Sequence, residues 1–155
     1  MFQTILVPLD GSPLAEQSLP YAAELCRLSG GLLLLVRIVP SPTMPPSRFS
    51  MVDAAVWPIR QAQLEQEAVD YLTGLNGRFA ITPANGQTII GRGPTRDTLL
   101  RVIEERDADV VVMTSRRRGG LARWVLGSTA DFLVQNSPVP VLLLRQQVSG
   151  NRVVE

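Results

Sequence analysis

The chain has 155 residues, of which 45% are apolar and 19% are charged, and its formal net charge is +1. These values are typical of a single globular domain, and the small charge does not favour a general nucleic-acid binder. The lack of histidine excludes enzymes with a histidine base, and the single cysteine excludes an internal disulfide. No basic leader precedes the first apolar run, and no apolar run is long enough to span a bilayer, so we expect a cytoplasmic protein.

The first part of the chain predicts a buried strand, a tight loop and a helix. The apolar run at 5–9 stops at residues 10–13, where Ser12 is a typical N-cap and is followed by a proline suited to the first helical position. Farther along the helix, Pro20 lacks the N–H that would bond to Glu16, and this predicts a kink. One helical face is formed by residues spaced four, three and four apart: Ala15, Leu19, Ala22 and Cys26.

The next part predicts a second strand, a long loop and a second helix. A continuous apolar run occupies 32–39, as expected of a strand that is buried on both faces. Five of the twelve prolines follow within 40–58. This composition predicts an irregular loop, and long loops in compact domains are often functional. A helical face then recurs at Leu64, Ala68, Leu72 and Leu75.

The remainder of the chain continues the alternation of strands and helices. Apolar runs predict strands at 87–90, 110–113 and 139–144. Residues 91–95 are predicted as a turn into a third helix, and a fourth helix is predicted at 128–137. The third helix carries its apolar face on Leu99, Val102 and Ile103. Residues 1–145 are therefore expected to form one domain, followed by a polar C-terminal tail at 146–155.

This order predicts an α/β fold. Apolar strands separated by amphipathic helices indicate a doubly wound parallel sheet of five strands, with helices on both faces. In such sheets ligands bind outside the carboxyl ends of the strands, where the strand order reverses. Three loops are predicted at that edge: residues 10–12, the segment after Val39 and the segment after Met113. We expect them to form a site.

The segment TSRRRGGLARWVLGSTAD at 114–131 has two interpretations. Gly127 and Ser128 at a helix start favour an anion, because the first N–H groups of a helix are unpaired and its dipole is positive there. Alternatively, Ser128 is only an N-cap with Asp131 closing a capping box, and the arginines form a solvated turn. There is no Walker A motif and no GxGxxG motif after the first strand. Asp10 likewise either braces its turn or accepts a hydrogen bond from a ligand.

Taken together, these segments resemble the universal stress protein family. The resemblance is carried by residues 5–12 (ILVPLDGS), 109–113 (DVVVM), 119–121 (GGL), 124–128 (WVLGS) and 138–142 (PVPVL). It implies a Rossmann-like five-stranded sheet in a homodimer that pairs through the last strand, from Val139 to Leu144. Many members bind ATP through a loop with glycine at the positions of Thr114, Arg117 and Gly127, followed by serine or threonine at Ser128. Only the last two positions match here.

The resemblance also implies a cofactor site for ATP, with Mg²⁺ as an accompanying ion and no separate metal site. Adenine and ribose are bordered by Pro8, Asp10 and Ile38, with Leu9 in the same segment. Met113 and Thr114 lie beneath the nucleotide. Phosphate is held by the backbone amides of Gly127, Ser128 and Thr129. Arg117 replaces a glycine, so its side chain either crowds the ribose and phosphates or reaches them with its guanidinium.

The expected function is that of a stress-response sensor or regulator that binds ATP and works with a protein partner that the sequence does not identify. Slow hydrolysis is the most catalysis expected, since no histidine is available as a base. The alternative is a dimeric interaction module of the same fold that binds no ATP and uses the arginine loop as a docking surface. An ATP-dependent adenylating enzyme is disfavoured, because the loop at 10–13 is poor in glycine.

Overall fold

The computed structural model describes residues 2–41, 51–82, 84–115 and 127–145. Five parallel strands form one sheet in the order β3-β2-β1-β4-β5. The strands are β1 (Thr4–Leu9), β2 (Leu32–Val39), β3 (Gly86–Arg92), β4 (Val110–Ser115) and β5 (Val141–Arg145). The helices are α1 (Pro13–Glu16), α2 (Leu19–Ser29), α3 (Met51–Arg78), α4 (Thr95–Glu105) and α5 (Ser128–Asn136). The predicted doubly wound α/β fold is confirmed.

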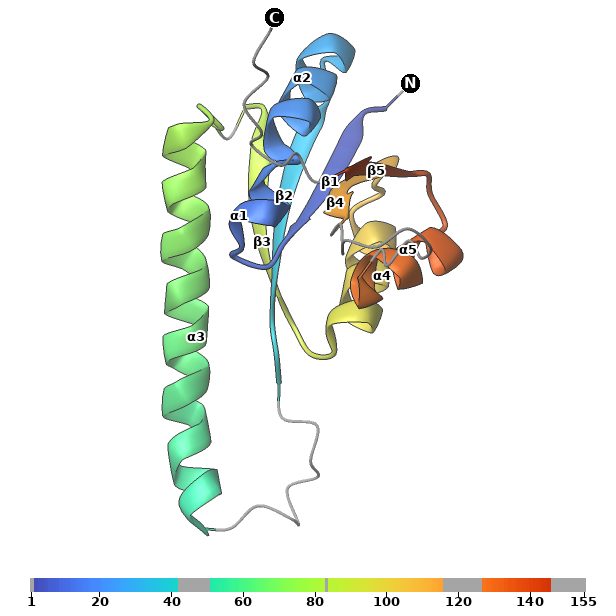
Figure 1. Ribbon diagram of the computed structural model, residues 1–155. Helices are drawn as coiled ribbons and strands as arrows, with labels where there is room; N and C mark the ends of the chain where they lie inside the picture. The colour runs from blue at the N-terminus through green and yellow to red at the C-terminus, as the bar shows by residue number, and fades with distance from the viewer. Residues whose placement is uncertain (1, 42–50, 83, 116–126, 146–155) are drawn as a thin grey trace, which may run out of the picture.

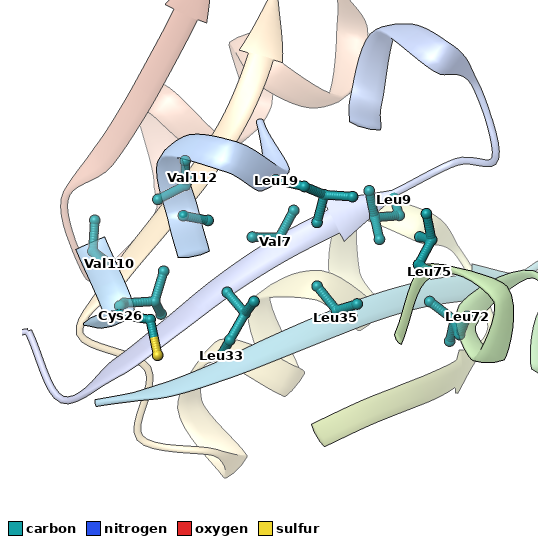
Figure 2. Packing of buried hydrophobic residues seen from close by; sticks show 12 residues of the cluster. Val7, Leu9, Leu19, Cys26, Leu33, Leu35, Leu72, Leu75, Val110 and Val112 are labelled. Carbon is teal, nitrogen blue, oxygen red and sulfur yellow. The ribbon is translucent and has the colours of Figure 1, made fainter. Parts of the chain in front are cut away.

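Alternate residues of the central strands point to opposite faces of the sheet, so each face has its own apolar core. Ile5, Val7 and Leu35 pack with α2 and α3 on one face, as Figure 2 shows for this cluster. Leu6 and Leu34 pack with α4 and α5 on the other face. Figure 1 shows α3 on one side of the sheet and α4 and α5 on the other. Full burial of each such side chain stabilises the fold by about 1.5–3 kcal/mol.

Pro20 has a larger effect than the predicted kink. The first helix ends at Glu16, and a second helix starts at Leu19 and holds Pro20 in its first turn. A proline is tolerated there because the N–H that it lacks has no partner inside the helix. Ser18, in the junction, is fully buried and its Oγ donates to the Ala15 carbonyl at 2.6 Å. The proline therefore breaks the helix into two segments.

The predicted loop at 40–58 is partly wrong. α3 begins at Met51 and carries Pro58 in its interior, whereas residues 42–50 lie outside the described residues. A proline inside a helix removes one hydrogen bond, at a cost of about 3 kcal/mol, without preventing the helix from continuing. Good helix formers on both sides of Pro58 favour that continuation. Figure 1 shows that the first turns of α3 extend past the end of β2.

The boundaries of the last three strands also differ from the prediction. β3 includes Gly91, which was expected in a turn. A Cβ at this position would lie 2.6 Å from Cδ1 of Ile38, so a larger residue would not fit. Glycine at this position permits close packing rather than a turn. β4 continues past Met113 to Ser115, and β5 begins at Val141 after a turn held by Ser137. No helix within the described ranges is long and apolar enough to cross a membrane.

We predict that Asp109 makes stability depend on acid pH. Its Oδ2 accepts hydrogen bonds from the N–H groups of Thr4 and Gln3, both at 2.8 Å. These bonds lower the pKa of Asp109 below its ordinary value of 3.8. Because the folded protein favours the ionised Asp109 carboxylate, this group stabilises the fold at pH values above its ordinary pKa. The contribution is lost as the pH falls through the lowered pKa of the folded state.

The Asp109→Asn variant should therefore melt at a lower temperature than the wild type at pH 7, and the difference should shrink as the pH falls below about 4. Thermal unfolding followed by circular dichroism at several pH values measures this. Asp107→Asn, at an exposed position on the same loop, is the control. A difference in melting temperature between wild type and Asp109→Asn that stays constant with pH contradicts the assignment.

Candidate functional site

A cleft of about 610 Å³ opens at the carboxyl edge of the sheet, between the ends of β1, β2 and β4 and the starts of α4 and α5. Of the ten residues predicted for the site, nine line this cleft: Pro8, Leu9, Asp10, Ile38, Met113, Thr114, Gly127, Ser128 and Thr129. The tenth, Arg117, lies outside the described residues, as do the other arginines of its loop. The sheet therefore brings together residues that are more than one hundred positions apart in the sequence.

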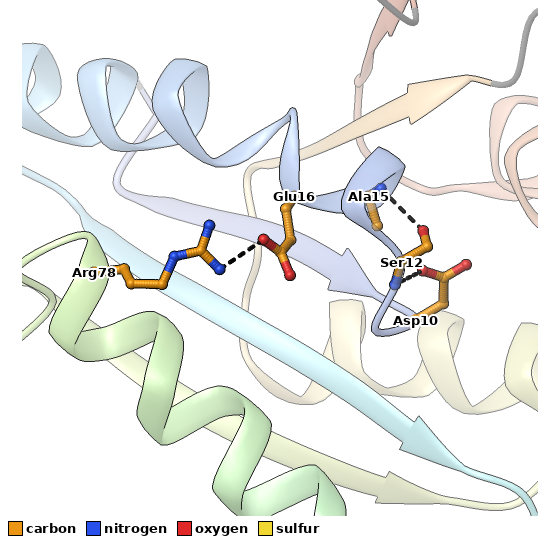
Figure 3. A network of polar contacts seen from close by, with 5 residues as sticks. All are labelled: Asp10, Ser12, Ala15, Glu16 and Arg78. Carbon is orange, nitrogen blue, oxygen red and sulfur yellow. Dashed lines mark hydrogen bonds and ion pairs between the residues drawn. The ribbon is translucent and has the colours of Figure 1, made fainter.

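The turn after β1 is held by its own side chains. Asp10 Oδ1 accepts the Ser12 N–H at 2.9 Å, and Ser12 Oγ accepts the Ala15 N–H at 3.2 Å, as Figure 3 shows. Gly11 between them has φ +85°, a conformation that L side chains rarely adopt. Asp10 thus braces the turn, as one of its two interpretations predicted. Asp10 also lines the cleft, so it belongs to the site as well as to the turn.

α5 presents an open N-terminus to the cleft. Its N-cap is Gly127, with φ +87°, and no side chain among the described residues caps the first turn. The alternative interpretation, in which Ser128 is the N-cap, is wrong, because Ser128 is already helical. Asp131 does not close a capping box but accepts a hydrogen bond from Gln135 at 3.0 Å. A Cβ placed on Gly127 would have no heavy atom of the described residues within 4 Å, so none of these residues crowds this position.

A second helix start lies on the same cleft; the sequence predicted this start, after the turn at 91–95, but not that it belongs to the site. Thr95 and Leu99 of α4 line the cleft, and the N-cap of α4 is Pro94, which makes no side-chain capping bond. The positive ends of two helix dipoles therefore face one cavity. Each favours negative charge within its first turn. The signal in the sequence is Gly93-Pro94 directly after a strand, which is a typical helix start.

Arg37 is another cleft residue that sequence reasoning missed. It lies on β2, and its guanidinium carbon is 5.6 Å from the centre of the Tyr71 ring. A Cβ on Gly11 would lie only 2.9 Å from Nη1 of Arg37, so the guanidinium packs closely against the turn after β1. Burial and the nearby Glu16 carboxylate raise the pKa of Tyr71. Glu16 itself forms an ion pair with Arg78 at 2.8 Å. In the sequence, the signal for Arg37 was its position as a lone charge within an apolar strand.

Thr114 forms part of the cleft wall at the end of β4. It is 9% exposed, and its Oγ1 has no hydrogen-bond partner among the described residues. Met113 before it is also buried and packs on the face covered by α4 and α5. Within the described ranges, no three acidic or cysteine side chains gather as metal ligands would. The polar character of the cleft therefore comes from helix N–H groups, the hydroxyls of serine and threonine residues, and single charged residues.

Comparisons with known proteins agree on one family. The model of the universal stress protein family matches residues 1–145. Universal stress protein G of Salmonella typhimurium is 33% identical over 147 residues, covering 94% of this chain and 100% of that protein. The structure of universal stress protein UspA from Lactobacillus plantarum is similar with a TM-score of 0.77 at 21% identity, covering 93% of this chain and 98% of that chain. A family protein from Arabidopsis thaliana with AMP bound gives 0.60 at 13% identity, covering 94% and 93%.

We predict that Asp10→Ala lowers the free energy of unfolding by about 1 kcal/mol, because the Ser12 N–H loses its acceptor. Asp10→Asn should lose less, since the amide oxygen of asparagine can accept the same bond. Urea unfolding of both variants measures the difference. Equal losses in the two variants contradict the bracing role, because the carboxylate charge rather than the hydrogen bond would then stabilise the turn.

Proposed function

Because this chain belongs to the universal stress protein family, we propose that its cleft binds an adenine nucleotide, ATP or a relative such as AMP. The observation that carries the proposal is the uncapped start of α5 at a cleft that also contains Asp10 and the end of β4. A volume of about 610 Å³ lies within the range of roughly 300–1,000 Å³ that is usual for small-molecule sites. The family protein from Arabidopsis thaliana with AMP bound supports the choice of ligand.

Each end of the nucleotide would meet a different part of the cleft. Ile38 gives an apolar surface of the kind that a purine base requires, and Pro8 extends this surface at the end of β1. The phosphates would lie at the start of α5, where unpaired N–H groups and the helix dipole favour an anion. Mg²⁺ would arrive with the phosphates of ATP. Asp10 is the carboxylate among the described lining residues that would face the ion or its water.

The proposed role is a cytoplasmic stress-response sensor or regulator rather than a fast enzyme. The chain contains no histidine, and Asp10, which already accepts the Ser12 N–H, is poorly placed as a general base. Slow ATP hydrolysis is therefore the most that the lining residues support. In such a role the bound nucleotide alters how the protein meets a protein partner. The partner's affinity must differ between the free and the bound states for this to work.

We also propose a homodimer that pairs through β5. In the described sheet this strand has a neighbour, β4, on one side only. Leu142 on the open edge is 42% exposed, and the strand is otherwise apolar except for Arg145. An apolar edge strand invites pairing with a second copy, since its backbone groups are unpaired on the outer side.

The nucleotide proposal is tested by calorimetric titration of the wild type with Mg-ATP and with AMP. Gly127→Glu should abolish binding, because it places a carboxylate at the start of α5, where phosphate is expected. Gly127→Gln is the matched control, since it brings the same backbone strain at φ +87° and a side chain of similar size without the charge. The glutamate variant should bind at least about tenfold more weakly than the glutamine variant.

Similar affinities in the glutamate and glutamine variants contradict the phosphate position. A folded wild type, free of co-purified nucleotide, that gives no heat with either ligand contradicts nucleotide binding. That result favours the interaction module without ATP.

The dimer is tested by Leu142→Lys, which places a charge on the open edge of β5. The variant should elute as a monomer in size-exclusion chromatography with light scattering, whereas the wild type elutes as a dimer. Leu28→Lys, at a position 67% exposed on α2, is the control and should remain dimeric. A Leu142→Lys protein of unchanged mass contradicts pairing through β5.

A further inference from the structure

We propose that the side-chain hydroxyl of Thr114 binds a sugar hydroxyl of the nucleotide and makes this chain selective for ribonucleotides. The inference rests on the proposed function, because it names a contact within the same cleft. It differs from the contacts that the family motif implies. The motif has glycine at this position, which offers backbone atoms only.

Thr114 differs from the other buried serine and threonine residues of the described chain, although the buried hydroxyl of Tyr71 also has no hydrogen-bond partner there. Ser18, Thr98 and Ser115 each donate their hydroxyl to a backbone carbonyl, at 2.6, 3.4 and 3.2 Å. Thr114 Oγ1 has no such partner within the described residues. Buried polar groups are hydrogen-bonded in the great majority of cases, and one left unpaired destabilises the protein. A valine would fill the same volume without an unpaired hydroxyl, so packing alone does not account for threonine here.

The position of Thr114 matches the sugar of a nucleotide bound as proposed. Strand β4 lies beside β1 in the sheet, and α5 follows β4 along the chain. The apolar surface for the base is at the ends of β1 and β2, and the anion site is at the start of α5. Thr114 at the end of β4 lies between them. In any nucleotide the sugar connects the base to the phosphate, so the sugar is the group that passes over β4.

The hydroxyl can reach the ligand by rotation of its own side chain. Thr114 Oγ1 is shielded from solvent in this structure, although the residue lines the cleft. A rotation about χ1 moves the hydroxyl to another staggered position, and such positions are the normal rotamers of threonine. Because Oγ1 has no hydrogen bond to a described residue, the rotation breaks none. The neighbouring Ser115 lacks this freedom, since its Oγ is bonded to the Leu144 carbonyl across the strand pair.

The test compares wild type, Thr114→Val and Thr114→Ser with three ligands: AMP, 2′-deoxy-AMP and 3′-deoxy-AMP. Wild type should bind AMP about threefold to tenfold more tightly than one of the two deoxy analogues, as expected for one neutral hydrogen bond. Thr114→Val should bind AMP more weakly by a similar factor and should no longer distinguish AMP from that analogue. Thr114→Ser keeps the hydroxyl and should retain the preference.

Thermal unfolding without ligand separates this contact from a structural role. Thr114→Val should melt at the same temperature as wild type or higher, because it removes a buried hydroxyl that has no partner. A lower melting temperature, with AMP and both analogues weakened equally, means that the hydroxyl supports the fold and overturns the inference. Equal AMP affinities in wild type and Thr114→Val overturn it while leaving the proposed function intact. Failure of wild type to bind any nucleotide overturns both.

Discussion

The burial of the middle of β1 between two neighbouring strands is the constraint on which the structure depends. Ile5, Leu6 and Val7 have no exposed surface, and β1 is paired with β2 on one side and with β4 on the other. The chain leaves β1 toward β2 and returns later to β4, so the connections run in opposite directions from this strand. Parallel strands all end at the same edge, and the reversal beside β1 leaves a crevice there. The site is thus a consequence of how β1 is buried.

The same topology determines the electrostatics of the crevice. Each helix that follows a strand begins at the carboxyl edge, so α4 and α5 both direct their N-termini toward the cleft. Neither start carries a side-chain cap among the described residues. The chain as a whole has a net charge of only +1. A local attraction for anions therefore arises from backbone dipoles rather than from an excess of basic residues.

Sequence patterns predicted the fold well because a buried parallel strand has to be apolar at every position. The run at 32–39 gave β2 with its correct ends, and the resemblance assembled nine residues that the structure brings to one cleft. The prolines within 40–58 led to the prediction of a loop where α3 has already begun. A proline removes one N–H donor, but the sequence alone does not tell whether the helix ends there. The capping role given to Ser128 was wrong because the Gly127 conformation is not visible in the sequence. The unpaired Thr114 hydroxyl depends on tertiary contacts that no local pattern encodes, whereas Arg37 was visible as a lone charge in an apolar strand but not as a residue of the cleft.

The polar groups of the cleft fall into two sets with different physical roles. Asp10 and Ser12 accept hydrogen bonds within the turn after β1, and the guanidinium of Arg37 packs between that turn and the Tyr71 ring. These groups fix the shape of the cleft before a ligand arrives, which reduces the entropy lost on binding. The first N–H groups of α5 and the hydroxyl of Thr114 make no such internal bonds among the described residues. In a crevice with no ligand to bind, the polar groups of both sets would be expected to form hydrogen bonds within the protein. The first N–H groups of α5 and the Thr114 hydroxyl suit this crevice to a ligand that carries a hydroxyl near its centre and an anion at one end.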